Sequence, residues 1–594
     1  MSFSNLRAAR KTKDARSFAK GPQAHANTQE NLVNLEPLAS ETAEVHMESQ
    51  DRISSDTEAA LQSLHKLPDT LCVRSTEKEG RGLWAGQPIP RGSVILTSKP
   101  HISVLSNKKL ASYCSSCFEE ASEAGLKRCA QCRVVHYCNS ECQSKDWWAH
   151  KRECTALQEW AKHAPSADVS VPSDAVRCLA RWLWKRQKKG PESEWARQLA
   201  AMQSNRRSMQ PTGFEFHTYL AHSLVRYLGI ESPDGLQNFG IGSPGELLDL
   251  TSRFATNSYT VTTADLTPVG ACVSPVVSLI NHSCSPNAAI VFPRMSKDPS
   301  IQEPQISVVA LRDIQPTEQI LTSYIDTTLP RTLRRRELME AYSFTCECSL
   351  CVATHPAEPD PREAVWCPKS CGGMCSLPTE ENSLSQCAAC KAAIKDTDAV
   401  LDAVRIGQQG LDKATALQMK DPAKAIQLTT NLIPILVSAK LVSSCHPLLG
   451  LSRLHQTLLI SALAASPSQD TLDEAIRTAM RNTTGLSMIL QEGHPVRGVA
   501  LAEAGKLLAV DEMEAKPANA HPDAFPPTGP PRLKLAYETL MRARQELLVG
   551  FGLANEGGRV GRSVRDALAA LEKEMAVWRD GVRNAIDDMP KRVV

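Results

Sequence analysis

Short apolar runs separated by glycine and proline turns begin at Leu71, in the stretch LCVRSTEKEGRGLWAGQPIPRGSVILTSKP, and they predict a β-rich unit. From 173 to 256 the apolar positions recur with helical spacing, and the Ser-Asp pair at 173–174 suits the N-terminal cap of the first helix. Strand-like alternation returns over 257–325, and residues 396–594 are mostly helical in pattern. An α+β, multidomain fold is therefore expected.

The C-terminal helical region contains an internal repeat. The segment HPLLGLSRLHQTLL begins at His446, and HPVRGVALAEAGKLL begins at His494, with Gly450 and Gly498 in register. This spacing suits a repeat of helix pairs, which bury their apolar faces only by stacking on neighbouring pairs. A helical repeat domain is therefore expected over residues 396–594.

Residues 1–68 are expected to form a disordered tail. The first twenty residues carry six basic side chains against Asp14, whereas residues 21–60 carry eight acidic side chains against Arg52 and few aromatic ones. A basic start is also compatible with a targeting signal, but a solvated tail is the preferred interpretation.

The length of 594 residues corresponds to three or four domains, and the net charge of +2 gives no general electrostatic reason to bind nucleic acid or membrane. We find no apolar run near the roughly 20 residues of a membrane span and no signal-peptide core. The 20 cysteines fall mostly into CxxC-type groups, which favours reduced thiolates that hold metal over disulfides. An intracellular protein of the cytoplasm, the nucleus or both is expected.

The first group of cysteines, over residues 114–154, contains eight potential zinc ligands in four pairs. Tetrahedral zinc needs four thiolate or imidazole donors, so eight donors make two structural sites without an open position. The pairs and their spacing resemble the MYND zinc module, in which the first pair joins the third and the second joins the fourth. That resemblance implies one zinc on Cys114, Cys117, Cys138 and Cys142, and another on Cys129, Cys132, His150 and Cys154.

Five further motifs occur in a fixed order: GRGLWA at 80–85, NSYTV at 257–261, NHSCSPN at 281–287, SYID at 323–326 and FTCECSLC at 344–351. The ordered set resembles the SET-domain methyltransferases. With the MYND module inserted after the first motif, the chain is similar to the SMYD (SET and MYND) protein-lysine methyltransferases over about residues 70–351.

The resemblance implies a β-rich SET core over 69–326, split by the zinc module at 114–154 and a mainly helical insert at 155–256. A cysteine-rich post-SET region then covers 327–395. The resemblance extends more weakly through 396–594, where the family carries a tetratricopeptide-like helical array that forms one wall of a substrate cleft.

The resemblance also implies S-adenosylmethionine as cofactor. Its methionine end is expected on the glycine loop and its adenine edge at the backbone of His282. Asn281 offers amide donor and acceptor groups, and Asn257 and Phe344 complete the pocket. The loop residues are Gly80, Arg81, Gly82 and Leu83. By the same carry-over, Cys284 joins Cys346, Cys348 and Cys351 in a third zinc site, which clamps the segment of Phe344 over the cofactor.

Tyr324 is the expected catalytic residue. Methyl transfer from a sulfonium to a lysine amine is an in-line displacement, which needs alignment of donor and acceptor and an amine that is neutral. In relatives the matching tyrosine hydroxyl lies at the methyl group and orients it, and Tyr259 is expected to line the lysine channel. The chain is thus expected to be a protein-lysine N-methyltransferase that acts on histone or non-histone proteins.

Two interpretations stay open for each of two features. Cys367, Cys371, Cys387 and Cys390, with Cys375 as a competing ligand, form either a fourth zinc site or a degenerate knuckle packed on the helices. The protein as a whole is either the enzyme or a non-catalytic adaptor with a relic SET core, whose zinc module and helical repeats recruit partners. Proline-rich peptides are possible partners of the MYND module, and direct binding of nucleic acid is not expected because the sequence lacks a strong basic patch.

Overall fold

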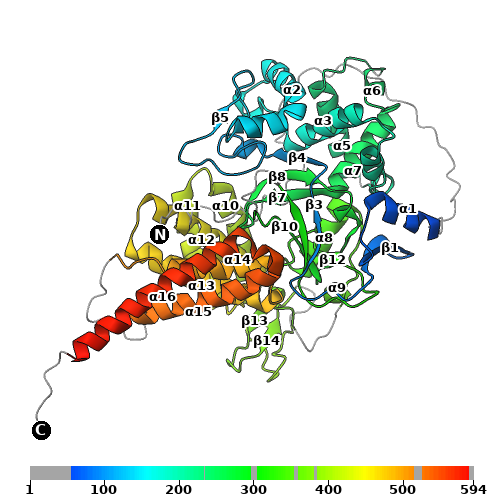
Figure 1. Cartoon of the computed structure of the whole chain (residues 1–594). Helices are drawn as coiled ribbons and strands as arrows, with labels where there is room; N and C mark the ends of the chain where they lie inside the picture. Colours follow the sequence, from blue (N-terminus) through cyan, green and yellow to red (C-terminus); the bar gives the residue numbers. More distant parts are fainter. Residues whose placement is uncertain are drawn as a thin grey trace, which may run out of the picture.

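The computed structural model describes residues 55–209, 211–232, 234–295, 304–352, 359–379, 384–513 and 525–587 (Figure 1). Small sheets occupy the middle of the molecule. The cysteine module and a helical insert lie above them in Figure 1, and the C-terminal helices lie to the lower left.

The first described element contradicts part of the expected tail. Helix α1 (Ser55–His65) packs beside strand β1 (Leu71–Thr76), and Leu61 is buried there. The Gln62 amide donates to the Leu71 carbonyl (2.8 Å) and accepts from the Val73 amide (3.1 Å). The prediction of disorder is therefore wrong for α1, because its side chains complete the edge of β1, and residues 1–54 lie outside the described residues.

Strands from both sides of the inserts build the β-rich core. One sheet has the order β10-β11-β3, another has β4-β8-β7, β1 pairs with β2 in antiparallel fashion, and β9 pairs with β12 in parallel. The strands of the core are β2 (Gly80–Ala85), β3 (Val94–Ser98), β4 (Ile102–Leu105), β7 (Ser258–Thr262), β8 (Pro268–Val273), β9 (Asn281–His282), β10 (Ala288–Val291), β11 (Ile306–Ala310) and β12 (Leu321–Thr322). Because β3 and β4 precede the inserts and their partners follow them, the core closes across the inserts, as expected of a split domain.

The cysteine module contains β5 (Lys127–Arg128) and β6 (His136–Tyr137), and it ends in the long helix α2 (Ser140–Lys162). This helix runs through the boundary expected at residue 154. The insert contributes α3 (Asp174–Lys189), α4 (Glu194–Ala200), α5 (Pro211–Tyr227), α6 (Asp234–Gln237) and α7 (Pro244–Asn257). Ser173 caps α3 as predicted, and the predicted apolar face of α3 is buried.

A buried ionic network joins the module to the insert. Glu153 on α2 accepts from Arg177 Nε (2.9 Å) and from Arg181 Nε (3.1 Å) on α3, and Arg181 also donates to Asp146 (2.9 Å). All four side chains are buried. Burial alone would raise the pKa of Glu153, but the guanidinium groups of Arg181 and Arg177 hold it well below its usual range.

We expect the substitution Glu153→Gln to lower the free energy of unfolding by about 3–5 kcal/mol, because it leaves two buried guanidinium groups without their shared anion. The midpoint of chemical denaturation measures this change. Glu159→Gln, on the exposed side of the same helix, is the matched control and should change little. Equal midpoints for the two variants would show that the network contributes no net stability.

The segment after the core contains α8 (Arg331–Tyr342), α9 (Ser349–Val352) and the hairpin of β13 (Ala364–Trp366) and β14 (Met374–Ser376). The C-terminal helices follow, and each packs on the next. They are α10 (Thr397–Leu417), α11 (Pro422–Ser438), α12 (His446–Ala465), α13 (Gln469–Ile489), α14 (Pro495–Leu508), α15 (Pro530–Gly550) and α16 (Gly558–Asp587). The expected C-terminal array of packed helices is therefore confirmed.

The two copies of the internal repeat form α12 and α14, which each begin at a His-Pro pair. These helices are the first members of successive helix pairs. Gly450 packs against Leu411 of α10, and Gly498 packs against Leu547 of α15. Val291 and Val309 of the core strands share a buried cluster with the array helices, so the array is seated on the sheet β10-β11-β3.

Helix α12 is the one helix among the described residues that is long and apolar enough to cross a membrane by length and composition. Its window has a mean hydropathy of 1.3, and 56% of it is buried inside the fold, where α12 packs on α10, α11 and α13. The expectation that no apolar run approaches the length of a membrane span is therefore wrong for residues 446–465.

Candidate functional site

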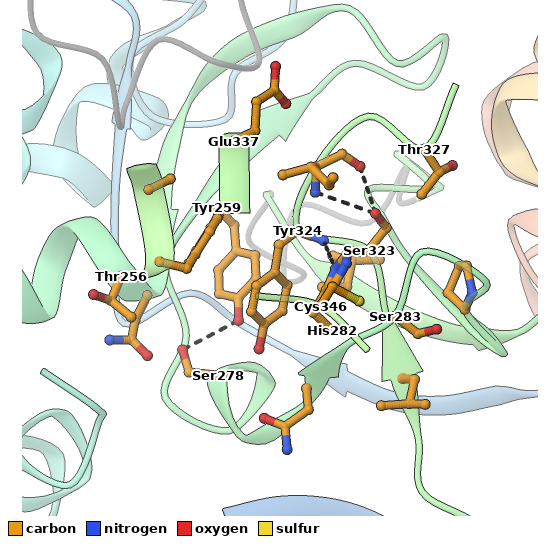
Figure 2. Close-up of a pocket in the computed structure, with 18 of the residues that line it drawn as sticks. Thr256, Tyr259, Ser278, His282, Ser283, Ser323, Tyr324, Thr327, Glu337 and Cys346 are labelled. Carbon is orange, nitrogen blue, oxygen red and sulfur yellow. Dashed lines mark hydrogen bonds between the residues drawn. The ribbon is translucent and has the colours of Figure 1, made fainter. Parts of the chain in front are cut away.

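A cleft of about 1140 Å³ lies between the β-rich core, helix α8 and the array. Most of its lining comes from the core, at β2, β7, β9 and the segment after β12, and Leu490, His494 and Val496 of the array line it as well. Figure 2 shows part of this pocket, with Tyr259, His282 and Tyr324 among the labelled residues. Stretches separated by hundreds of positions in the sequence therefore meet at one cleft.

The catalytic candidate Tyr324, which is also expected at the cofactor's methyl group, lines this cleft with six of the eight other residues expected to bind the cofactor: Gly80, Arg81, Asn257, Asn281, His282 and Phe344. Gly82 and Leu83 do not line it. The Leu83 side chain is fully buried in the core, and a Cβ on Gly82 would collide with the side chains of Gln319 and Asn281. These two residues pack the loop against the core. The sequence of the motif does not show which of its residues pack in this way and which contact a ligand.

The Asn281 side chain fixes the glycine loop. Its amide nitrogen donates to the carbonyl oxygens of Arg81 (3.1 Å) and Glu79 (3.3 Å). Gly80 adopts a φ of +65°, which favours glycine, and no atom lies within 4 Å of where its Cβ would stand. The loop therefore presents open backbone to the cleft in a fixed position.

Tyr324 lies at the centre of an aromatic wall. Its hydroxyl donates to the Ile280 carbonyl (2.7 Å), and its ring centroid lies 4.9 Å from that of Tyr342. Burial, with the neighbouring Tyr259 and Tyr342, raises the pKa of Tyr324 well above its usual value, and burial raises the pKa of Tyr342 to about 12. The phenols therefore stay neutral at physiological pH and act as dipoles, not as bases.

Tyr259 also lines the cleft, where its hydroxyl donates to Ser278 Oγ (3.4 Å; Figure 2). Burial raises its pKa above the ordinary value. The sequence analysis expects Tyr259 in this region, but it does not identify Tyr342, whose only signal is its place two residues before Phe344.

The His282 side chain connects Tyr324 to a cysteine cluster. Its Nδ1 accepts from the Tyr324 backbone amide (3.0 Å; Figure 2), so the ring proton belongs on Nε2, which lies 3.3 Å from Cys284 Sγ. Burial lowers the pKa of His282 to about 4, so the ring is neutral at physiological pH. The sequence analysis expects His282 only beside the adenine and does not anticipate this link.

Among the described residues, four groups of cysteine and histidine ligands have all their donor atoms within 4.8 Å of one another. We call them cluster 1 (Cys114, Cys117, Cys138, Cys142), cluster 2 (Cys129, Cys132, His150, Cys154), cluster 3 (Cys284, Cys346, Cys348, Cys351) and cluster 4 (Cys367, Cys371, Cys387, Cys390). Clusters 1 and 2 group the ligands as the MYND resemblance implies, cluster 3 unites Cys284 with the distant trio, and Cys375 is outside cluster 4.

The spacing of the sulfurs suits tetrahedral metal. The Cys117–Cys138, Cys129–Cys154 and Cys284–Cys351 sulfur pairs are 3.7, 3.9 and 3.5 Å apart. Four sulfurs about 2.3 Å from one zinc ion would lie ~3.8 Å apart, whereas a disulfide would be ~2.05 Å long. The donor sets of these clusters therefore suggest zinc sites.

The surroundings of cluster 2 orient its histidine ligand, and those of cluster 3 offset the charge that it would carry. In cluster 2, His150 Nε2 lies 3.4 Å from Cys129 Sγ, and Nδ1 faces the Glu153 carboxylate at 3.8 Å. In cluster 3, the fully buried guanidinium of Arg334 lies 4.0 Å from Cys351 Sγ. Four thiolates on one zinc ion leave a net negative charge, which a buried arginine offsets. Neither Glu153 nor Arg334 has a signal in the sequence, because charged residues in helical patterns are assigned to the solvent face.

Comparison with known proteins shows which family and which proteins this chain resembles. The SET domain family matches residues 80–325. Histone-lysine N-methyltransferase SMYD3 of Homo sapiens is 31% identical over 278 residues, which are 47% of this chain and 60% of the relative. "SET domain and MYND-type zinc finger protein 6" of Schizosaccharomyces pombe is 31% identical over 280 residues, or 46% of this chain and 50% of the relative. Residues 80–325 thus match the SET domain family, and about half of the chain is similar to the SMYD lysine methyltransferases.

The match to the SMYD3 of Mus musculus is longer, at 26% identity over 434 residues, which cover 73% of this chain and 86% of the relative. The alignments with the Homo sapiens and Schizosaccharomyces pombe relatives span 60% and 50% of those proteins, less than two thirds of each. The resemblance to the SMYD group and the β-rich SET fold are thus confirmed, while the boundaries of the expected domains stay a prediction.

Proposed function

We propose that this SMYD-related SET protein transfers the methyl group of S-adenosylmethionine to the side-chain amine of lysine in protein substrates. The observation that supports this most strongly is the convergence of the glycine loop, Asn281, Phe344 and Tyr324 on one cleft. Its volume of about 1140 Å³ exceeds the roughly 300–1,000 Å³ of common ligand pockets, which leaves room for a cofactor and a lysine side chain.

The residues present suit the cofactor. The open backbone at Gly80 suits its polar methionine end, and the amide of Asn281 keeps that backbone in place. The rings of His282 and Phe344, 6.0 Å apart, offer apolar faces for the adenine and its sugar. The faces of Tyr324 and Tyr342 attract a sulfonium by the interaction of a cation with π-electrons. When bound, the cofactor supplies an electrophilic methyl group.

The chain's own contribution is alignment and exclusion of water. The neutral aromatic wall disfavours the ammonium form of an incoming lysine, so the amine is in the state that can attack. Because the Tyr324 hydroxyl donates its proton to the Ile280 carbonyl, its lone pairs are left to accept weak hydrogen bonds from a polarised methyl group. The hydroxyl and that carbonyl would position the methyl group of a bound cofactor for attack by the amine.

The substrate is proposed to be a protein, because the cleft is bounded by the array. Leu490, His494 and Val496 face the core across it, and the Gln491 amide donates to the Pro286 carbonyl (2.7 Å), which joins the two walls. A cleft bounded on one side by a helical array can hold the polypeptide segments before and after the target lysine. The names of the relatives include a histone-lysine methyltransferase, and we propose histone or non-histone proteins as the substrate class.

Incubation of the full-length protein with labelled S-adenosylmethionine and a cell extract tests the proposal. We expect label on lysine side chains of a small number of proteins, and a rise in melting temperature with the cofactor alone, because a ligand at 100 times its Kd stabilises by about 2.7 kcal/mol. A protein that binds the cofactor but labels nothing would favour the adaptor interpretation. The absence of both effects would contradict any cofactor site in the cleft.

A further inference from the structure

Cluster 4 belongs to neither the SET motifs nor the MYND module. It lies at the β13–β14 hairpin, where Cys367 and Cys371 flank one turn and Cys387 and Cys390 flank another. The Cys367–Cys390 and Cys371–Cys387 sulfur pairs are each 3.5 Å apart. That spacing equals the shortest in the other clusters and is close to the ~3.8 Å of sulfurs around one zinc ion.

The turn at Cys387 has the same backbone geometry as the zinc knuckles of clusters 1 and 2. In each, the residue after the CxxC adopts a positive φ, and its amide donates to the carbonyl of the first cysteine. The three bonds are Phe118 to Cys114 (2.9 Å, φ 61°), Arg133 to Cys129 (3.1 Å, φ 56°) and Lys391 to Cys387 (3.0 Å, φ 58°). The turn therefore presents Cys387 and Cys390 in the same arrangement as the CxxC turns of clusters 1 and 2.

The packing at Gly373 is a second, independent observation. A Cβ on Gly373 would lie 2.7 Å from Cys387 Sγ and 2.9 Å from the Ala389 side chain. Any larger residue there would push the sulfur away from the other three. The neighbouring Cys375 is fully buried and is not part of the group, so the four donors are selected by the fold.

We propose that cluster 4 binds a structural zinc ion and that this ion braces the helical array against the SET core. The hairpin is continued by the connection between α11 and α12, which pairs with β13. The Trp366 amide donates to the Lys440 carbonyl (2.8 Å), and the Val442 amide donates to the Ala364 carbonyl (3.2 Å). The metal therefore fixes one end of a hairpin that the array completes.

The other end of the hairpin lies between the two walls of the cleft. Arg362, 4% exposed, donates through Nε to the Thr327 carbonyl (2.7 Å) and through Nη2 to the Ile489 carbonyl (2.8 Å). Thr327 lines the cleft on the core side, and Leu490, the residue after Ile489, lines it on the array side. A metal that holds the hairpin thus holds the distance between the walls.

Cluster 4 also differs from the other three in accessibility. Cys371 and Cys390 are exposed, whereas every ligand of clusters 1, 2 and 3 is buried or half-buried. A chelator reaches an exposed site first, so the zinc of cluster 4 is the one that leaves most readily.

Native mass spectrometry of the full-length protein counts the bound metal. We expect four zinc ions in the unmodified protein and three in the double variant Cys371→Ser, Cys390→Ser, whose exposed positions tolerate serine. The matched control is Cys375→Ser, which lies on the same hairpin but outside the donor set and should keep four. Three ions in the unmodified protein would overturn the site, as would an equal count in the protein and the double variant.

Hydrogen exchange tests the brace. In the double variant the amides of Trp366 and Val442 should exchange at least about tenfold faster, because their bonds join the hairpin to the array. Unchanged exchange beside a lost zinc ion would overturn the bracing role while leaving the metal site in place.

A kinetic consequence rests on the proposed function. Loss of the brace should raise KM for a protein substrate about tenfold while the Kd of the cofactor stays unchanged, because the cofactor contacts lie on the core side of the cleft. The zinc count does not depend on methyl transfer, so failure of the metal site and failure of the proposed function are distinguishable. An unchanged KM in a variant with loosened walls would show that the array does not bind substrate.

Discussion

Tyr324→Phe is expected to lower kcat about 100- to 1,000-fold and to change the Kd of S-adenosylmethionine by less than about threefold. The substitution keeps the ring that packs on Tyr342 and removes only the hydroxyl that donates to the Ile280 carbonyl. Removal of one positioned polar group from a reaction centre commonly has an effect of this size. Rates of methyl transfer at saturating cofactor and calorimetric titration of the cofactor measure the two quantities.

Tyr219→Phe is the matched control, because Tyr219 is 63% exposed on α5 and does not line the cleft. Its kcat should equal that of the unmodified protein. If Tyr324→Phe retained full turnover, the hydroxyl would have no part in aligning the methyl group. If it lost cofactor affinity as well, its role would be to shape the pocket and not to act in the reaction.

Cys284→Ser is expected to remove one zinc ion and to raise the Kd of the cofactor about 10- to 100-fold. Cys284 is the member of cluster 3 that comes from the core turn, and the other three come from the segment after α8. Without it, two connections weaken: the one that holds Phe344 near the cleft, and the one from Cys284 through His282 to the Tyr324 amide. Native mass spectrometry and calorimetry of the same sample measure zinc and affinity.

Cys72→Ser controls for the loss of a thiol as such, since Cys72 is a half-buried cysteine on β1 outside all four clusters. It should keep its zinc and its affinity. A Cys284→Ser protein that lost zinc but bound the cofactor normally would show that cluster 3 stabilises the fold without shaping the cofactor pocket.

The cysteine clusters were the most predictable part of the chain. CxxC spacing alone indicates metal, because two thiolates from one tight turn converge on one ion. Spacing alone does not determine which pairs of cysteines share one ion. The grouping of Cys284 with a trio more than sixty positions away follows from the family resemblance and not from spacing, and for cluster 4, where no resemblance applied, the sequence left the choice of Cys375 open.

The residues that sequence reasoning missed share a physical cause. Arg334, Arg362 and Glu153 are charged, so a pattern of polar and apolar positions assigns them to solvent, yet each is buried against a partner outside its own helix. Helix α1 was missed for the opposite reason. It has one buried apolar residue, Leu61, in a polar background, and the side chains of Gln62 and Glu58 accept its hydrogen bonds from β1.

The pairing of β3 with β11 and of β4 with β8 governs the order in which the nascent chain can fold. Leu96 pairs with Val308, roughly two hundred residues later, so at a synthesis rate of about 5–20 residues per second the early strands wait some 10–40 s on the ribosome for their partners. During that interval their unpaired edges are open to wrong association. All eight ligands of clusters 1 and 2 have been synthesised by residue 154, so this module can become ordered beside those strands before their partners arrive.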